Sequence, residues 1–437
     1  MIDDTHSPKR QSWVASANGH AEFPIQNLPH GVFARPGKGP RGGVAIGDDI
    51  FDLAAAVDAG LFDGAVREAA EAASGATLNR FFGLGRDARV ALRRRLVDIL
   101  DTDGSDRARI EPLRAQLVHR ADDCRLELPA EIGDYTDFFA GINHAVNAGK
   151  QFRPDNPLLP NYKYVPIGYH GRASSIKVSG GDVRRPNGQR KPATETIPSF
   201  GPSRNLDFEL ELGVWIGPGN ELGQPISIAD AGNHIAGFCL LNDWSARDVQ
   251  GWEYQPLGPF LGKSFFTSIS PWVITPEAMA PFRIAQAKRP AGDPEPLPYL
   301  SDASDQAGGG LDIALEVSLL TEGLRTKGLP AHQLTASNAR HLYWTVAQLV
   351  AHHTCNGCNL RPGDIFGSGT ISGPTGDSLG SLLEISLGGR QPLTLASGET
   401  RRFLEDGDTV IMQAHCRREG YAGIGFGECR GTIVPAA

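Results

Sequence analysis

Residues 205–213 read Asn-Leu-Asp-Phe-Glu-Leu-Glu-Leu-Gly, which alternates apolar and acidic residues. Because successive side chains of a β-strand point to opposite faces, this alternation predicts a strand with one apolar face for the core. The other face carries the carboxylates of Asp207, Glu209 and Glu211. Neighbours on one face lie roughly 6.6 Å apart, so Glu209 and Glu211 can turn toward one cation. The stretch therefore predicts either a half-exposed strand with a solvated acidic face or part of a cation site.

The composition favours a small-molecule partner and a fold built from many short strands. The chain has 437 residues, with 42 Lys and Arg against 50 Asp and Glu and a formal net charge of -8. This acidic balance provides no overall attraction to nucleic acid or to an anionic membrane. The 53 Gly and 31 Pro residues are typical of short strands joined by turns. A chain of this length predicts two domains.

The six cysteines are too few for a disulfide framework, and the polar first residues do not resemble a signal peptide. We therefore expect a cytoplasmic protein. Cys355 and Cys358 have the C-x-x-C spacing of a metal or redox site, but the other cysteines do not form a matching second pair. The alternative is that Asn356 and Gly357 simply end a helix. Apolar runs such as residues 235–241 are too short to cross a bilayer.

The first domain is predicted to span residues 1–122 and the second residues 123–437. In the first, leucines recur every four residues between positions 87 and 100, which indicates an amphipathic helix packed on a small β unit. The charged faces of that helix are expected to be solvated. Pro129 and Gly133 follow a short polar run and mark the region of the boundary. Catalytic types of side chain become dense only in the second domain, which is therefore predicted to provide the function.

Three segments of the second domain are predicted to position polar residues. Residues 235–241 indicate a buried strand, and the polar residues 242–248 gather where it ends. Residues 338–354 indicate a helix that Ser337 can cap. Residues 382–386 indicate an apolar strand that contains a single acid, Glu384.

Four carboxylates at predicted strand or loop positions have no comparable set of Cys or His partners. An all-oxygen site for Mg²⁺ or Ca²⁺ therefore fits them better than a zinc site. Four negative charges exceed one divalent ion, so basic neighbours are needed, and Arg247 and Lys263 lie close in sequence to the last of the four. His144 is the nearest candidate for a general base, although a lone histidine is more often structural. Its spacing from Asp137 is compatible with one face of a helix. The four carboxylates are Asp137, Glu209, Glu211 and Asp243.

From about Trp13 to Pro435 the sequence resembles the fumarylacetoacetate hydrolase family. The resemblance implies a mainly β fold with some α, in which an N-terminal SH3-like barrel with helices precedes a C-terminal β-sandwich roll. It also implies a homodimer that hydrolyses a carbon–carbon bond of 4-fumarylacetoacetate to release fumarate and acetoacetate, the final step of tyrosine and phenylalanine degradation. The likeness is densest in residues 134–137, 168–175, 207–211, 242–248, 252–264, 369–373 and 425–427.

The resemblance implies a role for each residue of the site. His144 would be the base that activates water, Glu384 would orient it, and Arg247 would help to stabilise developing negative charge. Ca²⁺ would be held by Asp137, Glu209, Glu211 and Asp243. A second cation site would be lined by Asp243, Lys263 and Thr267, the latter two through backbone oxygens, and the implied cofactors are Ca²⁺ and Mg²⁺. The substrate would be bound by Phe139, Arg153, Tyr169, Gln250, Tyr254 and Thr370.

The expected chemistry also follows from the residue types. Hydrolysis of a carbon–carbon bond next to two carbonyls needs a carbon leaving group whose negative charge is held, and chelation of the β-diketone by a divalent ion supplies that hold. Water deprotonated by His144 would attack the carbonyl on the fumaryl side. The oxyanion that forms would be stabilised by Arg247, Gln250 and Lys263.

One position departs from the family pattern, because Phe139 stands where the family commonly has a tyrosine. Loss of one hydrogen-bond donor changes binding by about 0.5–1.5 kcal/mol, so affinity or preference would change while the reaction type would not. Three alternatives would share the carboxylate site: a related β-diketone hydrolase, an acylpyruvate hydrolase and a 2-oxo acid lyase. The acylpyruvate hydrolase and the lyase are not expected to have so large an N-terminal domain. A non-catalytic binding protein would not need His144 and Glu384 together.

Overall fold

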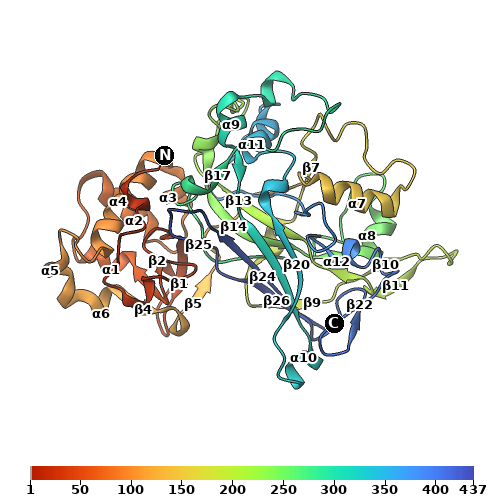
Figure 1. Cartoon of the computed structure of the whole chain (residues 1–437), viewed down its shortest axis with the longest axis horizontal. Helices are drawn as coiled ribbons and strands as arrows, with labels where there is room; N and C mark the ends of the chain where they lie inside the picture. The colour runs from red at the N-terminus through yellow and green to blue at the C-terminus, as the bar shows by residue number, and fades with distance from the viewer. Residues whose placement is uncertain (1) are drawn as a thin grey trace.

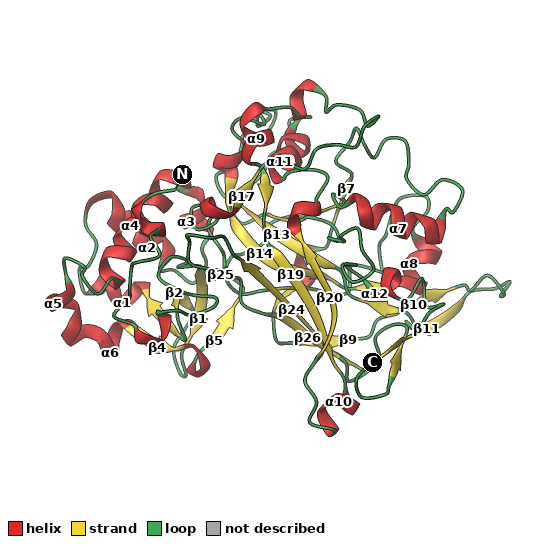
Figure 2. Ribbon diagram, viewed as in Figure 1, coloured by secondary structure: helices red, strands yellow, loops and turns green. Residues whose placement is uncertain are grey.

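Three β-sheets form the framework of this mixed α/β molecule, which is mostly sheet, as Figure 2 shows. The structure is a computed structural model that describes residues 2–437. The N-terminal part, red to orange in Figure 1, forms a smaller lobe beside the larger lobe built by the rest of the chain. No helix among the described residues is long and apolar enough to span a bilayer.

The smaller lobe contains a five-stranded sheet of order β4-β3-β2-β1-β5, in which all neighbouring strands are antiparallel. Its strands are β1 (His30–Ala34), β2 (Arg41–Ile46), β3 (Asp49–Asp52), β4 (Val118–Arg120) and β5 (Arg125–Glu127). Its helices are α1 (Leu53–Asp58), α2 (Gly64–Ala73), α3 (Asn79–Gly83), α4 (Gly85–Leu100), α5 (Arg107–Ile110) and α6 (Arg114–Leu117).

Helix α4 confirms the helix predicted near residues 87–100, and its leucines enter the core of the smaller lobe. Its charged faces are not all solvated, which corrects the expectation. Arg93 is buried and donates to the backbone carbonyl oxygens of Gln26 and Asn27 at 2.5 and 2.8 Å. The long guanidinium side chain thereby satisfies two carbonyl groups that the fold removes from water.

The larger lobe contains a seven-stranded sheet of order β7-β6-β21-β13-β14-β16-β8 and a second sheet of order β20-β19-β24-β26-β9, with β25 paired to β24. The first sheet comprises β6 (Tyr135–Phe138), β7 (Gly168–His170), β8 (Ile176–Val178), β13 (Leu210–Ile216), β14 (Ile235–Asp243), β16 (Thr267–Ile269) and β21 (Ile365–Gly367). The second comprises β9 (Asp182–Arg184), β19 (Ala314–Leu320), β20 (His332–Asn338), β24 (Thr409–Cys416), β25 (Ile424–Gly425) and β26 (Cys429–Val434).

Short two-stranded pairings and helices complete the larger lobe. The pairings join β10 (Asn187–Arg190) to β11 (Ser199–Pro202), β12 (Leu206–Asp207) to β15 (Ser245–Ala246), β17 (Arg283–Ile284) to β18 (Gly310–Leu311), and β22 (Leu393–Thr394) to β23 (Thr400–Arg401). The helices are α7 (Ile142–Phe152), α8 (Arg247–Glu253), α9 (Ala303–Gly308), α10 (Glu322–Thr326), α11 (Val346–Thr354) and α12 (Leu382–Ile385).

Both faces of the central strands β13 and β14 are buried. Leu212 of β13 and Leu240 of β14 belong to the core shared with the second sheet of the larger lobe. On the opposite face, Trp215 packs against Phe82 of the smaller lobe, with ring centroids 5.9 Å apart. Glu211 lies on this second face, because side chains alternate along a strand. The acidic face is therefore covered by the smaller lobe and by site loops, and the alternative of a half-exposed, solvated face is wrong.

The alternating stretch 205–213 is two strands, β12 and β13, and not the single strand that was predicted. Between them, the backbone N–H of Phe208 donates to Asp207 Oδ1 at 2.8 Å, and that of Glu209 donates to Asn242 Oδ1 at 3.0 Å. Side chains thus replace the backbone ladder at these two positions. The predicted buried strand over residues 235–241 is confirmed as part of β14.

Two other segments differ from prediction. The helix predicted over residues 338–354 begins only at Val346, because Ser337 belongs to β20 and Thr345 forms the capping box with Gln348. The strand predicted over residues 382–386 is the short helix α12. A five-residue segment with three apolar residues is too short for its period to distinguish a strand from a helix, so here the capping residue Ser381 decides.

Candidate active site

A cavity of about 520 Å³ lies where α7 and α8 meet the ends of β6 and β13. Twelve of the predicted site residues line it: Asp137, Phe139, His144, Arg153, Tyr169, Glu209, Glu211, Arg247, Gln250, Tyr254, Lys263 and Thr370. The other three contact the site through neighbours. Glu384 binds His144, Asp243 binds Lys263, and Thr267 Oγ1 lies 3.4 Å from Asp243 Oδ1. The structure therefore brings all the predicted site residues into one region.

Different elements supply these side chains. Asp137 lies on β6 and His144 on the following helix α7, so the two do not share a helix face, which corrects that expectation. The chain turns at Gly141, where an added Cβ would lie 2.3 Å from the carbonyl oxygen of Thr370. A residue without a side chain at this position lets α7 start close to the loop after β21.

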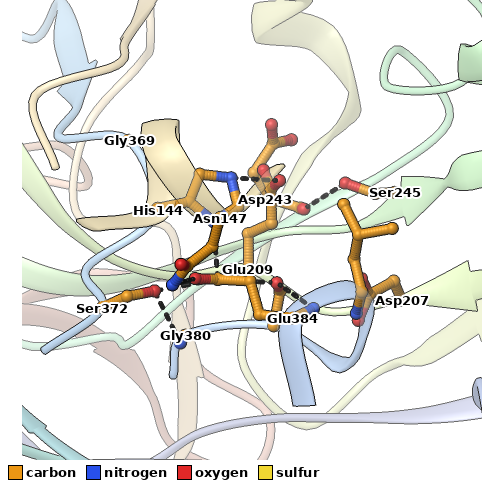
Figure 3. A network of polar contacts seen from close by, with 12 residues as sticks. His144, Asn147, Asp207, Glu209, Asp243, Ser245, Gly369, Ser372, Gly380 and Glu384 are labelled. Atoms are coloured by element: carbon orange, nitrogen blue, oxygen red, sulfur yellow. Dashed lines mark hydrogen bonds and ion pairs between the residues drawn. The ribbon is translucent and has the colours of Figure 1, made fainter. Parts of the chain in front are cut away.

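His144 and Glu384 form a buried pair at the base of the cavity, and Figure 3 shows their contact. His144 Nδ1 lies 2.6 Å from Glu384 Oε2. A carboxylate only accepts hydrogen bonds, so Nδ1 carries the proton and Nε2 of the neutral ring is left as an acceptor. The ring is thus oriented with its basic nitrogen away from Glu384.

The carboxylate of Glu384 is held by further donors. Oε2 accepts from the hydroxyls of Ser372 and Ser381 at 2.8 and 2.9 Å, and Oε1 accepts from Asn147 Nδ2 at 2.9 Å. Burial alone would raise the pKa of Glu384, but His144 and these donors outweigh it and lower the pKa below its usual value. Glu384 is therefore ionised at neutral pH.

Three buried carboxylates, those of Asp137, Glu211 and Asp243, each offer an oxygen within 4.8 Å of the others. Asp137 Oδ1 and Glu211 Oε1 are buried and have no hydrogen-bond partner among the described residues. Burial and mutual repulsion raise the pKa of Asp137 and of Glu211 well above their usual values. Unpaired carboxylate oxygens of this kind are the ligands that a hard divalent cation takes. The donor set thus fits Mg²⁺ or Ca²⁺.

Space beside this cluster is kept open by Gly367 on β21. A Cβ at this position would lie 2.6 Å from Asp137 Oδ1 and 2.8 Å from Glu211 Oε2. These distances are shorter than any real Cβ contact, so a side chain here would displace the carboxylates. The backbone of β21 thus forms one wall of the candidate metal site.

Glu209 lies beside the three-carboxylate cluster and is paired with two cations. Its carboxylate contacts Lys263 Nζ and lies 2.8 Å from Arg247 Nη1. Burial opposes ionisation, but Lys263 and Arg247 prevail and lower the pKa of Glu209 to about 2. Lys263 also lies 2.6 Å from Asp243 Oδ2, so one ammonium group links Glu209 to the cluster. Lys263 and Arg247 thus offset part of the surplus negative charge of the carboxylates, as the sequence predicts.

Asp207 belongs to the predicted acidic face but has no predicted role in the site. In the structure it holds two parts of the site in place. Its carboxylate accepts from the backbone N–H groups of Leu382 and Leu383 at 2.7 and 2.9 Å, at the start of α12. It also accepts from Arg247 Nε at 2.8 Å. Asp207 therefore fixes both Arg247 and the helix that bears Glu384. No local sequence pattern connects residue 207 with residues 382 and 383.

The positioning residues Asn147, Ser372 and Ser381 were also missed. For Ser381 a signal was present, because Ser381 and Glu384 have the Ser-x-x-Glu spacing that marks a helix start. Ser381 Oγ does receive the Glu384 N–H, as an N-cap would. Asn147 and Ser372 become recognisable only once the fold places them beside Glu384.

Phe139 forms part of an apolar wall beside the base. Its ring lies edge-on to His144 with centroids 5.5 Å apart, and also edge-on to Tyr162 at 5.9 Å. Tyr162 is buried and donates its hydroxyl to the Phe139 carbonyl oxygen at 2.7 Å. The half-buried Phe139 ring is thus fixed against His144 and faces the cavity.

The C-x-x-C pair does not join the site. Cys355 is exposed and Cys358 is half-buried, both are free thiols, and the cluster of possible metal ligands found among the described residues does not include them. Gly357 has a φ of +88°, which favours glycine at a helix end. This conformation agrees with the alternative that Asn356 and Gly357 end α11.

Comparisons with known proteins identify relatives over almost the whole chain. A protein-family model described as "Fumarylacetoacetase N-terminal" matches residues 26–129, and a second one, described as "Fumarylacetoacetate (FAA) hydrolase C-terminal", matches residues 135–434. The chain is 49% identical to a fumarylacetoacetase of Oryza sativa subsp. japonica, with 100% of each chain covered. It is 49% identical to that of Arabidopsis thaliana, covering 95% of this chain and 96% of the relative.

Among solved structures, the fumarylacetoacetate hydrolase from psychrophilic Exiguobacterium antarcticum superposes with a TM-score of 0.50. The match covers 94% of this chain and 100% of that one, at 16% identity. At this identity the likeness concerns the fold alone.

Proposed function

The chain belongs to the fumarylacetoacetate hydrolase family, and from this premise we propose that it hydrolyses 4-fumarylacetoacetate to fumarate and acetoacetate. This reaction is the final step of tyrosine and phenylalanine degradation. The observation that carries the proposal is the buried His144–Glu384 pair, which shares one region with a cluster of three buried carboxylates, two of which have an oxygen without a hydrogen-bond partner among the described residues. A base and a cation site side by side are what hydrolysis of a β-diketone requires.

The proposed divalent cation, Ca²⁺ or Mg²⁺, is held by the carboxylates of Asp137, Glu211 and Asp243, with Glu209 as the fourth ligand. Glu209 is included on the family resemblance; it is not one of the three clustered carboxylates, and its own carboxylate is paired with Lys263 and Arg247. The chemistry supplied there is Lewis-acid stabilisation of negative charge on a chelated β-diketone. We also propose that Asp243, Lys263 and Thr267 line a second cation site.

His144 is the proposed general base. Its Nδ1–H is held by Glu384, so Nε2 can take a proton from a water molecule in the cavity. The hydroxide adds to the carbonyl carbon on the fumaryl side, the carbon–carbon bond breaks, and the leaving carbon takes up a proton. Glu384 stabilises the imidazolium that exists between these steps.

Negative charge on the attacked carbonyl oxygen is proposed to be stabilised by Arg247, Gln250 and Lys263. Arg247 Nη2 is buried and has no hydrogen-bond partner among the described residues, so it is available to an oxyanion. Its Nη1 donates to Gln250 Oε1 at 3.1 Å, which fixes the two side chains together. Ion pairs with Asp207 and Glu209 hold the guanidinium of Arg247 in place in the cavity wall.

The remaining lining residues are proposed to bind the substrate. Arg153 follows the C-terminal end of α7, and its buried Nε has no hydrogen-bond partner among the described residues. A carboxylate of the substrate would accept a hydrogen bond from this nitrogen. Tyr169 donates to Asp243 Oδ2 at 3.2 Å and so links the substrate region to the cation site. The other proposed contacts are Phe139, Gln250, Tyr254 and Thr370.

We further propose the finer features of the family expectation. The five-stranded antiparallel sheet of the smaller lobe would be an SH3-like barrel, and the sheets of the larger lobe would be a β-sandwich roll. The first domain is proposed to span residues 1–122 and the second residues 123–437, so that the strand β5 (Arg125–Glu127), which completes the sheet of the smaller lobe, would come from the start of the second range. The location would be cytoplasmic. A homodimer is supported by exposed apolar side chains on the β10–β11 hairpin and on the loop after α8. The most exposed of them are Ile197, Phe200, Leu257 and Phe260.

The test of this function is an assay with 4-fumarylacetoacetate and, separately, an acylpyruvate, each with saturating divalent ion. We expect rapid loss of the conjugated-diketone absorbance of the first substrate and slow turnover of the second. A strong preference for the acylpyruvate, or cleavage of a 2-oxo acid without hydrolysis, would place the protein with the related activities instead.

A further inference from the structure

A second cavity, of about 480 Å³, shares no lining residue with the active-site cavity and lies between α4 of the smaller lobe and residues 276–283 of the larger one. Its lining is strongly basic although the chain as a whole has a net charge of -8. Two carboxylates, Asp3 and Glu277, face five arginines, which are Arg86, Arg89, Arg93, Arg94 and Arg283. We call this space the arginine cavity.

Two of the five arginines are neutralised within the protein. Arg89 pairs with Glu277 at 3.2 Å, and Arg94 pairs with Asp3 at 3.2 Å. The other three have no carboxylate within ion-pair distance among the described residues. Arg93 donates only to neutral oxygens, and the guanidinium of Arg283 lies over the Phe238 ring at 5.8 Å. The cavity thus has an excess of positive charge.

Two of the arginines, the paired Arg89 and the uncompensated Arg93, are also withdrawn from water. Arg89 is 2% exposed, and its Nη1 is buried with no hydrogen-bond partner among the described residues. His6 is also buried in the lining. Its Nε2 lies 2.8 Å from the backbone carbonyl oxygen of Glu277, and its side chain supplies no negative charge. Burial lowers the pKa of Arg93 to about 10 and also lowers that of Arg283, as expected for cations that lack full compensation.

We infer that the arginine cavity binds a small tetrahedral oxyanion of the phosphate class, either free or as a phosphate ester. Guanidinium groups match such oxygens with paired donors, and the uncompensated arginines match an anion of two or more charges. Arg86 lies on α4 of the smaller lobe and Arg283 on β17 of the larger lobe. A bound anion would therefore connect the two lobes and stabilise the folded chain.

The test measures the melting temperature of the metal-loaded full chain against increasing sulfate at constant ionic strength, with chloride as the balancing anion. Sulfate is the probe because it is a divalent tetrahedral anion that does not precipitate Mg²⁺. A specific site stabilises the folded state in a saturable manner. The test variant is Arg86→Gln/Arg283→Gln, and the control is Arg67→Gln/Arg80→Gln, which removes two arginines of the smaller lobe outside the cavity.

We expect a saturable increase in melting temperature for the wild-type chain and the control, and at least a tenfold weaker apparent affinity for the test variant. A rise that is linear in sulfate and equal in all three proteins would be a general salt effect and would overturn the inference. Should the test variant fail to fold, crystals of the wild-type chain soaked in selenate give a second measurement. Anomalous density in the arginine cavity supports the site, and its absence there overturns it.

A second arm replaces sulfate by glycerol phosphate. Saturation at lower concentration than sulfate would identify a phosphate ester as the ligand, whereas equal or weaker binding would identify the free anion. Either assignment requires that the Arg86→Gln/Arg283→Gln variant lose the saturable increase in melting temperature.

Discussion

The imidazole of His144 and the carboxylate of Glu384 lie 2.6 Å apart although 240 residues separate them in sequence. The pair is buried, with His144 on α7 and Glu384 on α12, and Figure 3 shows the two residues with the polar groups around them. Ser372, Ser381 and Asn147 hold the carboxylate in place. So many donors to one acid indicate that the fold maintains its charge and its direction toward His144.

If the two residues act as a unit, their replacement should be strongly non-additive. His144→Ala should lower kcat by roughly 10²–10⁴-fold while leaving metal content unchanged, because the base enters the chemical step. Glu384→Gln should also be slow, since an amide does not stabilise the imidazolium. The double variant should be scarcely slower than His144→Ala. Turnover measured at saturating metal decides this, and independent, multiplicative losses would show that another group activates the water.

Gly367→Ala should abolish divalent-ion binding, because its Cβ would lie 2.6 Å from Asp137 Oδ1. The expected result is loss of bound metal by elemental analysis and loss of turnover. Gly376→Ala is the matched control, since nothing lies within 4 Å of a Cβ there and its φ is not positive. Full metal occupancy and normal turnover in Gly367→Ala would mean that the ion binds elsewhere.

Phe139→Tyr should leave the reaction type unchanged and should tighten substrate binding by about 0.5–1.5 kcal/mol, because it introduces a hydrogen-bond donor beside the base. The measurement is KM and kcat for 4-fumarylacetoacetate. The Phe139 ring packs against both His144 and Tyr162. A variant that loses most of its kcat would therefore show that this wall is packed too closely to admit the hydroxyl.

Stability should fall in mild acid because of His30 on β1. This histidine is 3% exposed, and burial together with Arg93 and Arg89 lowers its pKa to about 3. Its pKa in the unfolded chain is about 6.5, so below that pH the unfolded chain binds a proton that the folded protein does not. The free energy of unfolding then falls by about 1.4 kcal/mol per pH unit, from about pH 6.5 toward pH 3.

Urea midpoints between pH 7 and pH 5 measure this effect. The wild-type chain and His332→Gln, a control on β20, should lose stability as the pH falls, and His30→Gln should lose less. Equal slopes for the wild-type chain and His30→Gln would show that His30 is not the group responsible.

The sequence allowed the buried strand β14 and the strand character of residues 205–213 to be predicted, because both patterns are local, but not the break that divides the second stretch into β12 and β13. The burial of Glu209 and Glu211 was not predictable, since it depends on the smaller lobe and on loops distant in sequence. The sequence predicts a strand around Glu384 because a five-residue segment with three apolar residues fits either element, and the cap at Ser381 is the signal that distinguishes the helix.

Only part of the active site could be predicted from local sequence patterns. The carboxylates indicated an oxygen-ligand cation site, but the association of His144 with Glu384 rested on the family resemblance. No spacing rule relates residues that a fold brings together from different helices. The same reason explains why Asp207 had no predicted role, since its partners Leu382 and Leu383 lie 175 and 176 residues away.

Hydrolysis of 4-fumarylacetoacetate in ¹⁸O-labelled water, with both products identified by mass spectrometry, tests the central claim most directly. Metal-loaded wild-type protein should yield fumarate and acetoacetate in equal amounts. One labelled oxygen should enter a carboxylate of fumarate and none should enter the carboxylate of acetoacetate, because water attacks the fumaryl carbonyl. Loss of the substrate without these two products, or a label in the acetoacetate carboxylate, would contradict the proposed reaction.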